Sequence, residues 1–138
     1  MSKTTSVSIS PADIVQTQLD AYNAHDVEAL IATYAPDARQ YEYPDRLIAQ
    51  GAPALRERMA ARFEASRPHA QLLHRIAVGN TVIDHERIVN QTPDGPVVRE
   101  LIAIYEVDAT PTDGEGGNAN GRIVSARFVF GEEIPAGK

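Results

Sequence analysis

Four polar or charged residues in a row, Asp84-His85-Glu86-Arg87, interrupt a segment whose other residues are mostly apolar and β-branched. Such a segment is typical of a β-strand, in which successive side chains point to opposite faces. Asp84 and Glu86 then share one face, and His85 and Arg87 share the other. A carboxylate that points into an apolar cavity has a raised pKa and can transfer protons near neutral pH. Asp84 is therefore a candidate catalytic acid or base.

This strand also has a purely structural interpretation. Both faces carry two apolar residues, so alternation alone does not decide which face is buried. The charged residues could instead form salt bridges with Arg75 or Arg99 at a solvated surface or an interface. That alternative applies to Asp84 as well as to Glu86 and Arg87.

A second candidate cluster is Tyr41-Glu42-Tyr43, directly before Pro44. Glu42 could accept a proton, and Tyr43 or Tyr41 could donate a hydrogen bond to a ligand carbonyl. The alternative is that these aromatic residues pack at a rim with Tyr34 and leave Glu42 exposed.

Histidines offer a further acid–base group. We expect His85 to be a hydrogen-bond donor, oriented by a carboxylate on a neighbouring strand such as Glu100. His74 is expected to be structural. We expect no metal site, because no two histidines have the i, i+4 spacing of a helix, and His69 and His74 would point to opposite faces of a strand.

Composition excludes several classes of protein. The 138 residues contain no cysteine, which excludes a thiolate nucleophile and cysteine-bound metal, and the only lysines are Lys3 and Lys138, which leaves none for a P-loop. A net charge of −6 gives no basic surface for nucleic acid or a membrane. No apolar run is long enough to span a bilayer, and residues 1–10 lack a signal-peptide pattern, so we expect a cytoplasmic protein.

The expected elements are three helices followed by four long strands. Ser10-Pro11 predicts a helix start, and apolar residues at helical spacing extend it to Tyr22. Further helices are expected from Asp26 to Tyr34 and from Pro53 to Pro68. The expected strands are a short one at Arg39–Tyr43, before a loop at Asp45–Gly51, and long ones at Gln71–Val78, Thr81–Gln91, Val97–Val107 and Arg122–Phe130.

This order predicts an α+β fold in which a curved antiparallel sheet wraps around three N-terminal helices and leaves a pocket at one end. We expect one domain at residues 10–132, flanked by a disordered tail at 1–9 and a second tail at 133–138. The Gly-rich segment Asp108–Gly121 is expected to be a mobile hairpin tip.

Several motifs resemble nuclear transport factor 2-like proteins. They are Tyr22-Asn23-Ala24-His25-Asp26, Tyr34-Ala35-Pro36-Asp37-Ala38, and Gly51 followed by Leu55-Arg56. The segment Gly121–Glu132 resembles the closing strand of the ketosteroid isomerase and SnoaL-like members. The resemblance covers residues 10–132 and implies a cone-shaped α+β barrel with a deep apolar cavity, commonly paired as a homodimer through the sheet.

The resemblance also suggests site positions. The tyrosine of the isomerase oxyanion hole corresponds to Gln18, and its aspartate lies near Ala103. Its base, which directly precedes a proline, corresponds to Tyr43, with Glu42 one residue earlier. Alignment of the turn at Asn80 would direct Asp84 and Glu86 inward.

We expect Met59, Phe63, Tyr105, Phe128 and Phe130 to contact a ligand, although the same apolar residues could equally fill a closed core. The resemblance favours the ligand-lining role for Phe128 and Phe130.

The predicted function is cofactor-free proton transfer on a small, mostly apolar carbonyl or hydroxyl compound, with isomerisation, cyclisation and dehydration all open. Asp84 or Glu42 would be the base, and Tyr43 or His85 the hydrogen-bond donor. The alternatives are a non-catalytic module that binds a small ligand and an association domain whose cavity is filled.

Overall fold

The structure is a computed structural model that describes residues 10–108 and 121–136. The tail expected at 1–9 lies outside the described residues, as does the hairpin tip expected at 108–121, except for its end residues Asp108 and Gly121. The helices are α1 (Pro11–Asn23), α2 (Val27–Ile31) and α3 (Ala52–Ser66). The strands are β1 (Tyr34–Glu42), β2 (Arg46–Gln50), β3 (His69–Val78), β4 (Thr81–Asn90), β5 (Val97–Asp108), β6 (Arg122–Phe130) and β7 (Ile134–Pro135).

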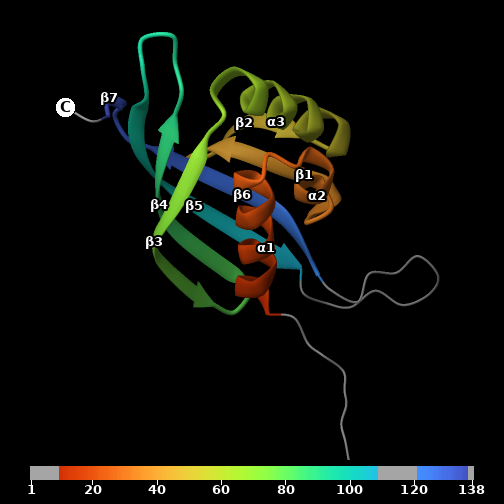
Figure 1. Cartoon of the computed structure of the whole chain (residues 1–138). Coiled ribbons are helices and arrows are strands. Elements are labelled where there is room, and N and C mark those ends of the chain that lie inside the picture. The colour runs from red at the N-terminus through yellow and green to blue at the C-terminus, as the bar shows by residue number, and fades with distance from the viewer. Residues whose placement is uncertain (1–9, 109–120, 137–138) are drawn as a thin grey trace, which may run out of the picture.

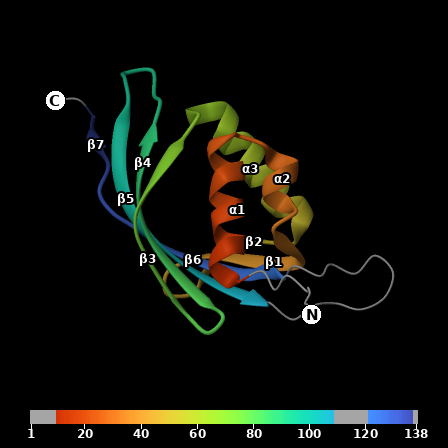
Figure 2. The same ribbon diagram turned by 60° about the horizontal axis from the view of Figure 1, so that its bottom comes forward.

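The strands form a single curved sheet in the order β2-β1-β6-β5-β4-β3, with β7 paired to β5. Figure 1 shows this sheet wrapping around the helices, and Figure 2 shows α1 and α3 lying on its concave side. This arrangement is the expected α+β cone. The sheet does not close on itself, since β2 and β3 lie at its two edges.

The first helix is fixed at both ends. The Ser10 hydroxyl accepts a hydrogen bond from the Asp13 amide, and the Asp13 carboxylate accepts one from the Ser10 amide, which together form a capping box. At the other end, the Asn23 side chain makes two hydrogen bonds to the backbone of Ala70, at 2.8 and 2.9 Å. These bonds attach the C-terminal end of α1 to the start of β3.

Long strands after residue 69 were predicted correctly, but the N-terminal half of the sheet differs in three respects. β1 begins at Tyr34, where the second helix was expected to end, and not at Arg39. Residues 46–50, expected within a loop, form β2, which pairs with β1 in an antiparallel hairpin. β1 also pairs with β6 in parallel, so the prediction of an entirely antiparallel sheet was wrong. A parallel pair needs a long connection, and here the rest of the sheet and α3 supply it.

A smaller difference concerns the C-terminal segment. Within the expected tail at 133–138, Ile134 and Pro135 pair with Val98 and Val97 of β5. In the part of the chain that the structure describes, no helix is long and apolar enough to cross a membrane.

Candidate functional site

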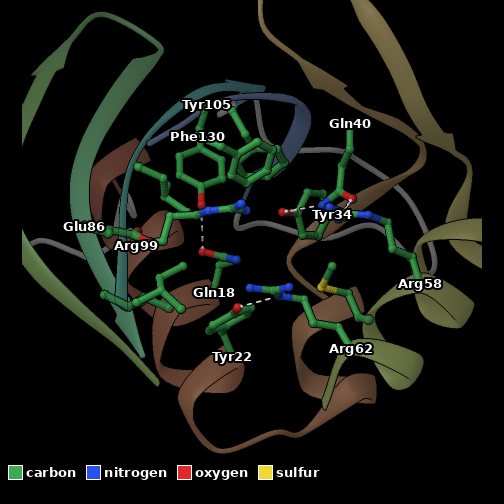
Figure 3. Close-up of a pocket in the computed structure, with 15 residues that line it drawn as sticks. Gln18, Tyr22, Tyr34, Gln40, Arg58, Arg62, Glu86, Arg99, Tyr105 and Phe130 are labelled. Atoms are coloured by element: carbon green, nitrogen blue, oxygen red, sulfur yellow. Dashed lines mark hydrogen bonds between the residues drawn. The ribbon is translucent and has the colours of Figure 1, made fainter. Parts of the chain in front are cut away.

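A cavity of about 210 Å³ lies between the concave face of the sheet and helices α1 and α3. Figure 3 shows side chains from both layers converging on it. More than half of its lining residues are apolar or aromatic, and the rest carry polar groups. The lining residues are Gln18, Leu19, Tyr22, Tyr34, Gln40, Arg58, Met59, Arg62, Glu86, Ile88, Arg99, Leu101, Tyr105, Phe128 and Phe130.

Glu86 is the one carboxylic acid among the described residues that line this cavity. Its side chain points inward because alternation along β4 buries Asp84, Glu86 and Ile88 together. Glu86 is 5% exposed, and its Oε2 atom is buried without a hydrogen-bond partner. Burial, followed by the charge of Asp84 and a hydrogen bond with it, raises the pKa of Glu86 from its ordinary value of 4.5 to about 8; the charge of Arg75 opposes this. Glu86 can therefore exist in either protonation state near neutral pH.

Asp84 also points inward, as the alignment at Asn80 suggested, but it does not line the cavity. It is fully buried and receives two hydrogen bonds from Arg75, at 2.7 and 2.9 Å. Arg75 in turn donates to Gln16 of α1. The sequence named Arg75 as a possible partner of Asp84 in a solvated or interfacial salt bridge. The pair forms, but it is buried, and each oxygen of Asp84 accepts a hydrogen bond from Arg75.

Three arginines reach the cavity from two directions. Arg58 and Arg62 lie one turn apart on α3, and Arg99 enters from β5 on the opposite side (Figure 3). Arg58 donates to Gln40 at 2.6 Å, and Arg62 donates to the Tyr22 hydroxyl at 2.9 Å. These partners are neutral groups.

Three tyrosines add hydroxyl groups to the wall. The Tyr105 hydroxyl donates to Gln18 Oε1 at 3.4 Å, and the Tyr34 hydroxyl accepts a hydrogen bond from Gln40 at 3.3 Å. Burial raises the pKa of Tyr34 to about 12 and that of Tyr105 well above its ordinary value. Both phenols therefore stay protonated at physiological pH and can donate hydrogen bonds to a ligand oxygen.

Four of the five residues expected to contact a ligand line the cavity. Met59 comes from α3, while Tyr105, Phe128 and Phe130 form an aromatic wall with ring centroids 6.5 and 5.9 Å apart. Phe63 does not reach the cavity. It lies one turn beyond Met59 on α3 and packs in the core against Tyr22, with ring centroids 5.4 Å apart.

None of the four residues expected to act as acid, base or hydrogen-bond donor lines this cavity: Asp84 lies buried in its ion pair with Arg75, and the other three lie elsewhere. Glu42 stands at the end of β1, where it forms a partly exposed salt bridge with Arg46 across the hairpin. Tyr43 follows in the turn and is 54% exposed. His85 lies on the outer face of the sheet, because it alternates with Asp84 and Glu86; there it contacts Glu100 at 2.7 Å, the carboxylate that was expected to orient it.

Sequence reasoning missed most of the polar wall. No role in the site was expected for Arg58 and Arg62, yet they directly precede Met59 and Phe63 and share their spacing of four. That spacing places the two arginines on the helical ridge beside the apolar one. Gln18 was named only as the counterpart of another residue type. No signal in the sequence distinguished Glu86 from Asp84 as the carboxyl that meets the cavity.

Among residues 10–108 and 121–136, no three His, Cys, Asp or Glu side chains are grouped so that they could hold a metal ion.

The sequence and the fold were compared with known proteins. The model of a family described as the SnoaL-like domain matches residues 15–115. Among curated proteins, none matches the sequence.

Three solved structures are similar in fold. The epoxide hydrolase/cyclase-like enzyme SalBIII of pyran ring formation in the polyether salinomycin is 17% identical, with a TM-score of 0.72, over 88% of this chain and 90% of that chain. An LEH-like epoxide hydrolase from Mycobacterium tuberculosis is 18% identical, with a TM-score of 0.70, over 87% and 81%. A second Mycobacterium tuberculosis protein, in complex with estradiol-17β-hemisuccinate, is 15% identical, with a TM-score of 0.69, over 86% and 92%. At these identities the similarity shows the fold alone.

Proposed function

Since this chain belongs to the SnoaL-like domain family, we propose that it is a cofactor-free enzyme that transfers a proton on a small carbonyl or hydroxyl compound in its cavity. The observation that carries the proposal is the Glu86 carboxyl. It lies in the cavity wall, is nearly fully buried and has one oxygen without a partner. We assign the acid–base role to Glu86 rather than to Asp84, because Arg75 holds both oxygens of Asp84.

The ionised Glu86 carboxylate would remove a proton from the carbon next to a carbonyl group. The electron pair of the broken C–H bond becomes the double bond of an enolate, and the negative charge moves to the carbonyl oxygen. Where a C=C bond adjoins the enolate, return of the proton from Glu86 to the far carbon of that bond completes an isomerisation. Attack of the enolate carbon on a second carbonyl of the same molecule forms a ring, and the resulting alkoxide takes the proton from Glu86. Departure of a β-hydroxyl group, which takes up that proton and leaves as water, completes a dehydration instead.

An enolate needs hydrogen-bond donors that are already in position. Tyr105 is the donor that we propose, because its phenol is buried and protonated and its bond to Gln18 is long, at 3.4 Å. A ligand oxygen can replace so weak a bond at little cost. Tyr105 and Glu86 both face the concave side, on the paired strands β5 and β4.

The names of similar structures are consistent with this class of chemistry. One is described as an epoxide hydrolase/cyclase-like enzyme and another as an LEH-like epoxide hydrolase. A third was solved with a steroid hemisuccinate, a small organic ligand.

Deuterium exchange tests the proposal with a panel of compounds in place of a single substrate. Small ketones, β-keto acids and β-hydroxy ketones are incubated with the protein in D2O, and loss of the α-proton signal is followed by NMR. We expect at least one compound to exchange in a protein-dependent way, Glu86→Gln to abolish that exchange, and Glu42→Gln to leave it intact, because Glu42 lies outside the cavity. Catalysed exchange that persists in Glu86→Gln would refute the role of this residue.

Two alternatives lead to different results in the same experiment. A non-catalytic binding module would retain a ligand but exchange no proton, either as wild type or as Glu86→Gln. An association domain would retain no ligand; the open cavity argues against that alternative.

We also propose a cytoplasmic homodimer that pairs through the outer face of the sheet. Ile76, Ile102 and Val129 are more than one-third exposed, and strand alternation places them on that face. Sedimentation equilibrium of the wild type and of Ile102→Glu tests the association: we expect a dimer that the charged substitution dissociates, and a monomeric wild type would contradict it.

A further inference from the structure

Positively charged side chains outnumber negatively charged ones in the cavity wall. Of the described residues that line it, Arg58, Arg62 and Arg99 carry positive charge and Glu86 alone can carry negative charge. Because burial keeps most Glu86 side chains protonated at neutral pH, even that single negative charge is mostly absent. The cavity wall is thus strongly cationic, although the chain as a whole has a net charge of −6.

The cavity arginines differ from two other arginines of this protein, because they lack a close carboxylate partner among the described residues. Arg75 and Arg56 each form an ion pair with a carboxylate, at 2.7 and 3.0 Å. Within the described residues, Arg58 and Arg62 have no carboxylate within 4.0 Å; their partners are the amides and hydroxyl of neutral side chains.

Arg99 is nearly as poorly neutralised. Its nearest carboxylate, Glu133, is 4.0 Å away and about half exposed. The Nε atom of Arg99 is buried and has no hydrogen-bond partner. An unpaired buried donor on a charged group is costly, so the Arg99 guanidinium is poorly satisfied within the described residues.

The guanidinium groups also destabilise one another. Burial, followed by the positive charge of Arg62, lowers the pKa of Arg58. Arg58 and Arg99 lie over the rings of Phe128 and Phe130, with distances of 5.9 and 5.1 Å to the ring centroids. An anion placed beside this aromatic wall would relieve the repulsion while an apolar body attached to it packs against the rings.

We infer that the cavity selects a small carboxylate whose apolar body is about one ring in size. An engineered cavity of roughly 150 Å³ holds benzene, and this one is about 210 Å³. A carboxylate matches the planar fork of a guanidinium. A phosphate monoester also matches the fork, but its bulkier tetrahedral group leaves less of the cavity of about 210 Å³ for an apolar body. That this carboxylate is a substrate rests on the proposed function. That the cavity binds it is a separate claim, which binding measurements test alone.

Binding of three probes tests the inference on the full chain. Benzoate, benzamide and phenyl phosphate are titrated separately by isothermal titration calorimetry, in low and in high salt. We expect benzoate to bind at least about tenfold more tightly than benzamide, a difference of about 1.4 kcal/mol. High salt should weaken benzoate binding more than benzamide binding.

Substitutions assign the selectivity to the cavity. Arg58→Gln and Arg62→Gln should each weaken benzoate binding about tenfold and change benzamide binding little. Arg58→Lys, which keeps the charge and loses the fork, should retain part of the preference. Arg56→Gln is the matched control, because Arg56 lies on the same helix but pairs with Glu28 at the surface.

The outcomes separate this inference from the proposed function. Equal affinities for benzoate and benzamide, a preference unchanged in both glutamine variants, tighter binding of phenyl phosphate, or no binding tighter than about 10 mM would each overturn the inference. Benzoate selectivity in a protein that exchanges no proton would support the carboxylate site and refute the catalytic proposal.

Discussion

The protonation of Glu86 should make the free energy of unfolding of this protein depend on pH, and Glu86→Gln should remove that dependence. Between its ordinary pKa of 4.5 and its folded value of about 8, the folded protein keeps a proton that the unfolded chain has released. The free energy of unfolding therefore falls as pH rises across this window. From about pH 5 to about pH 8, the titration of Glu86 should lower the free energy of unfolding by about 3 kcal/mol, since each pKa unit corresponds to about 1.4 kcal/mol.

Glutamine resembles the protonated acid and does not titrate, so Glu86→Gln should lack this contribution. We expect the variant and the wild type to have similar free energies of unfolding near pH 5 and the variant to be more stable by about 3 kcal/mol near pH 8. Urea unfolding followed by circular dichroism at several pH values measures the difference. Glu42→Gln, at the partly exposed hairpin salt bridge, serves as the control and should follow the wild type.

Parallel stability curves for wild type and Glu86→Gln would refute the reasoning. They would mean that Glu86 has the same proton affinity in the folded and unfolded chains, and hence that the cavity does not raise its pKa. The acid–base role would then lose its physical basis.

Three further substitutions test the elements around the cavity. Asp84→Asn should lower the free energy of unfolding by about 3 kcal/mol, because it leaves Arg75 without its charged partner. Urea unfolding measures this change, and a change below about 1 kcal/mol would show that the pair is solvated. Asn23→Ala should cost about 2 kcal/mol and remove the exchange protection of the Ala70 amide, since both side-chain bonds that attach α1 to β3 are lost; protected exchange at Ala70 would contradict it. Tyr105→Phe should slow catalysed deuterium exchange by about 100-fold or more with an unchanged thermal midpoint; an unchanged rate would remove Tyr105 from the mechanism.

The sequence was most informative where one periodicity continues over many residues. The strands from His69 onward and the three helix starts were predicted closely, because alternation, capping residues and proline act locally. β2 was missed because Arg46–Gln50 is short and its inward residue, Ala49, is small. The parallel pairing of β1 and β6 was missed because it depends on contacts across more than 80 residues, which local patterns do not encode.

The candidate site was only partly predictable for a similar reason. Alternation correctly placed Asp84 and Glu86 on one face of the strand. It did not indicate which of the two carboxyl groups pairs with Arg75 and which lines the cavity. That assignment depends on the register between β3 and β4, where Arg75 pairs with Asp84. The arginines on α3 were missed because long side chains at the edge of an apolar stripe reach either solvent or the interior.

The parallel pairing of β1 with β6 also affects the order in which the molecule can form. β1 and β2 join the remainder of the sheet only through β6, and β6 is the last long strand of the described chain. A nascent chain that ends before Arg122 therefore has two separate pieces of sheet, and its cavity lacks Phe128 and Phe130. Contacts so distant in sequence form slowly, and the pocket cannot be completed until synthesis has passed Phe130.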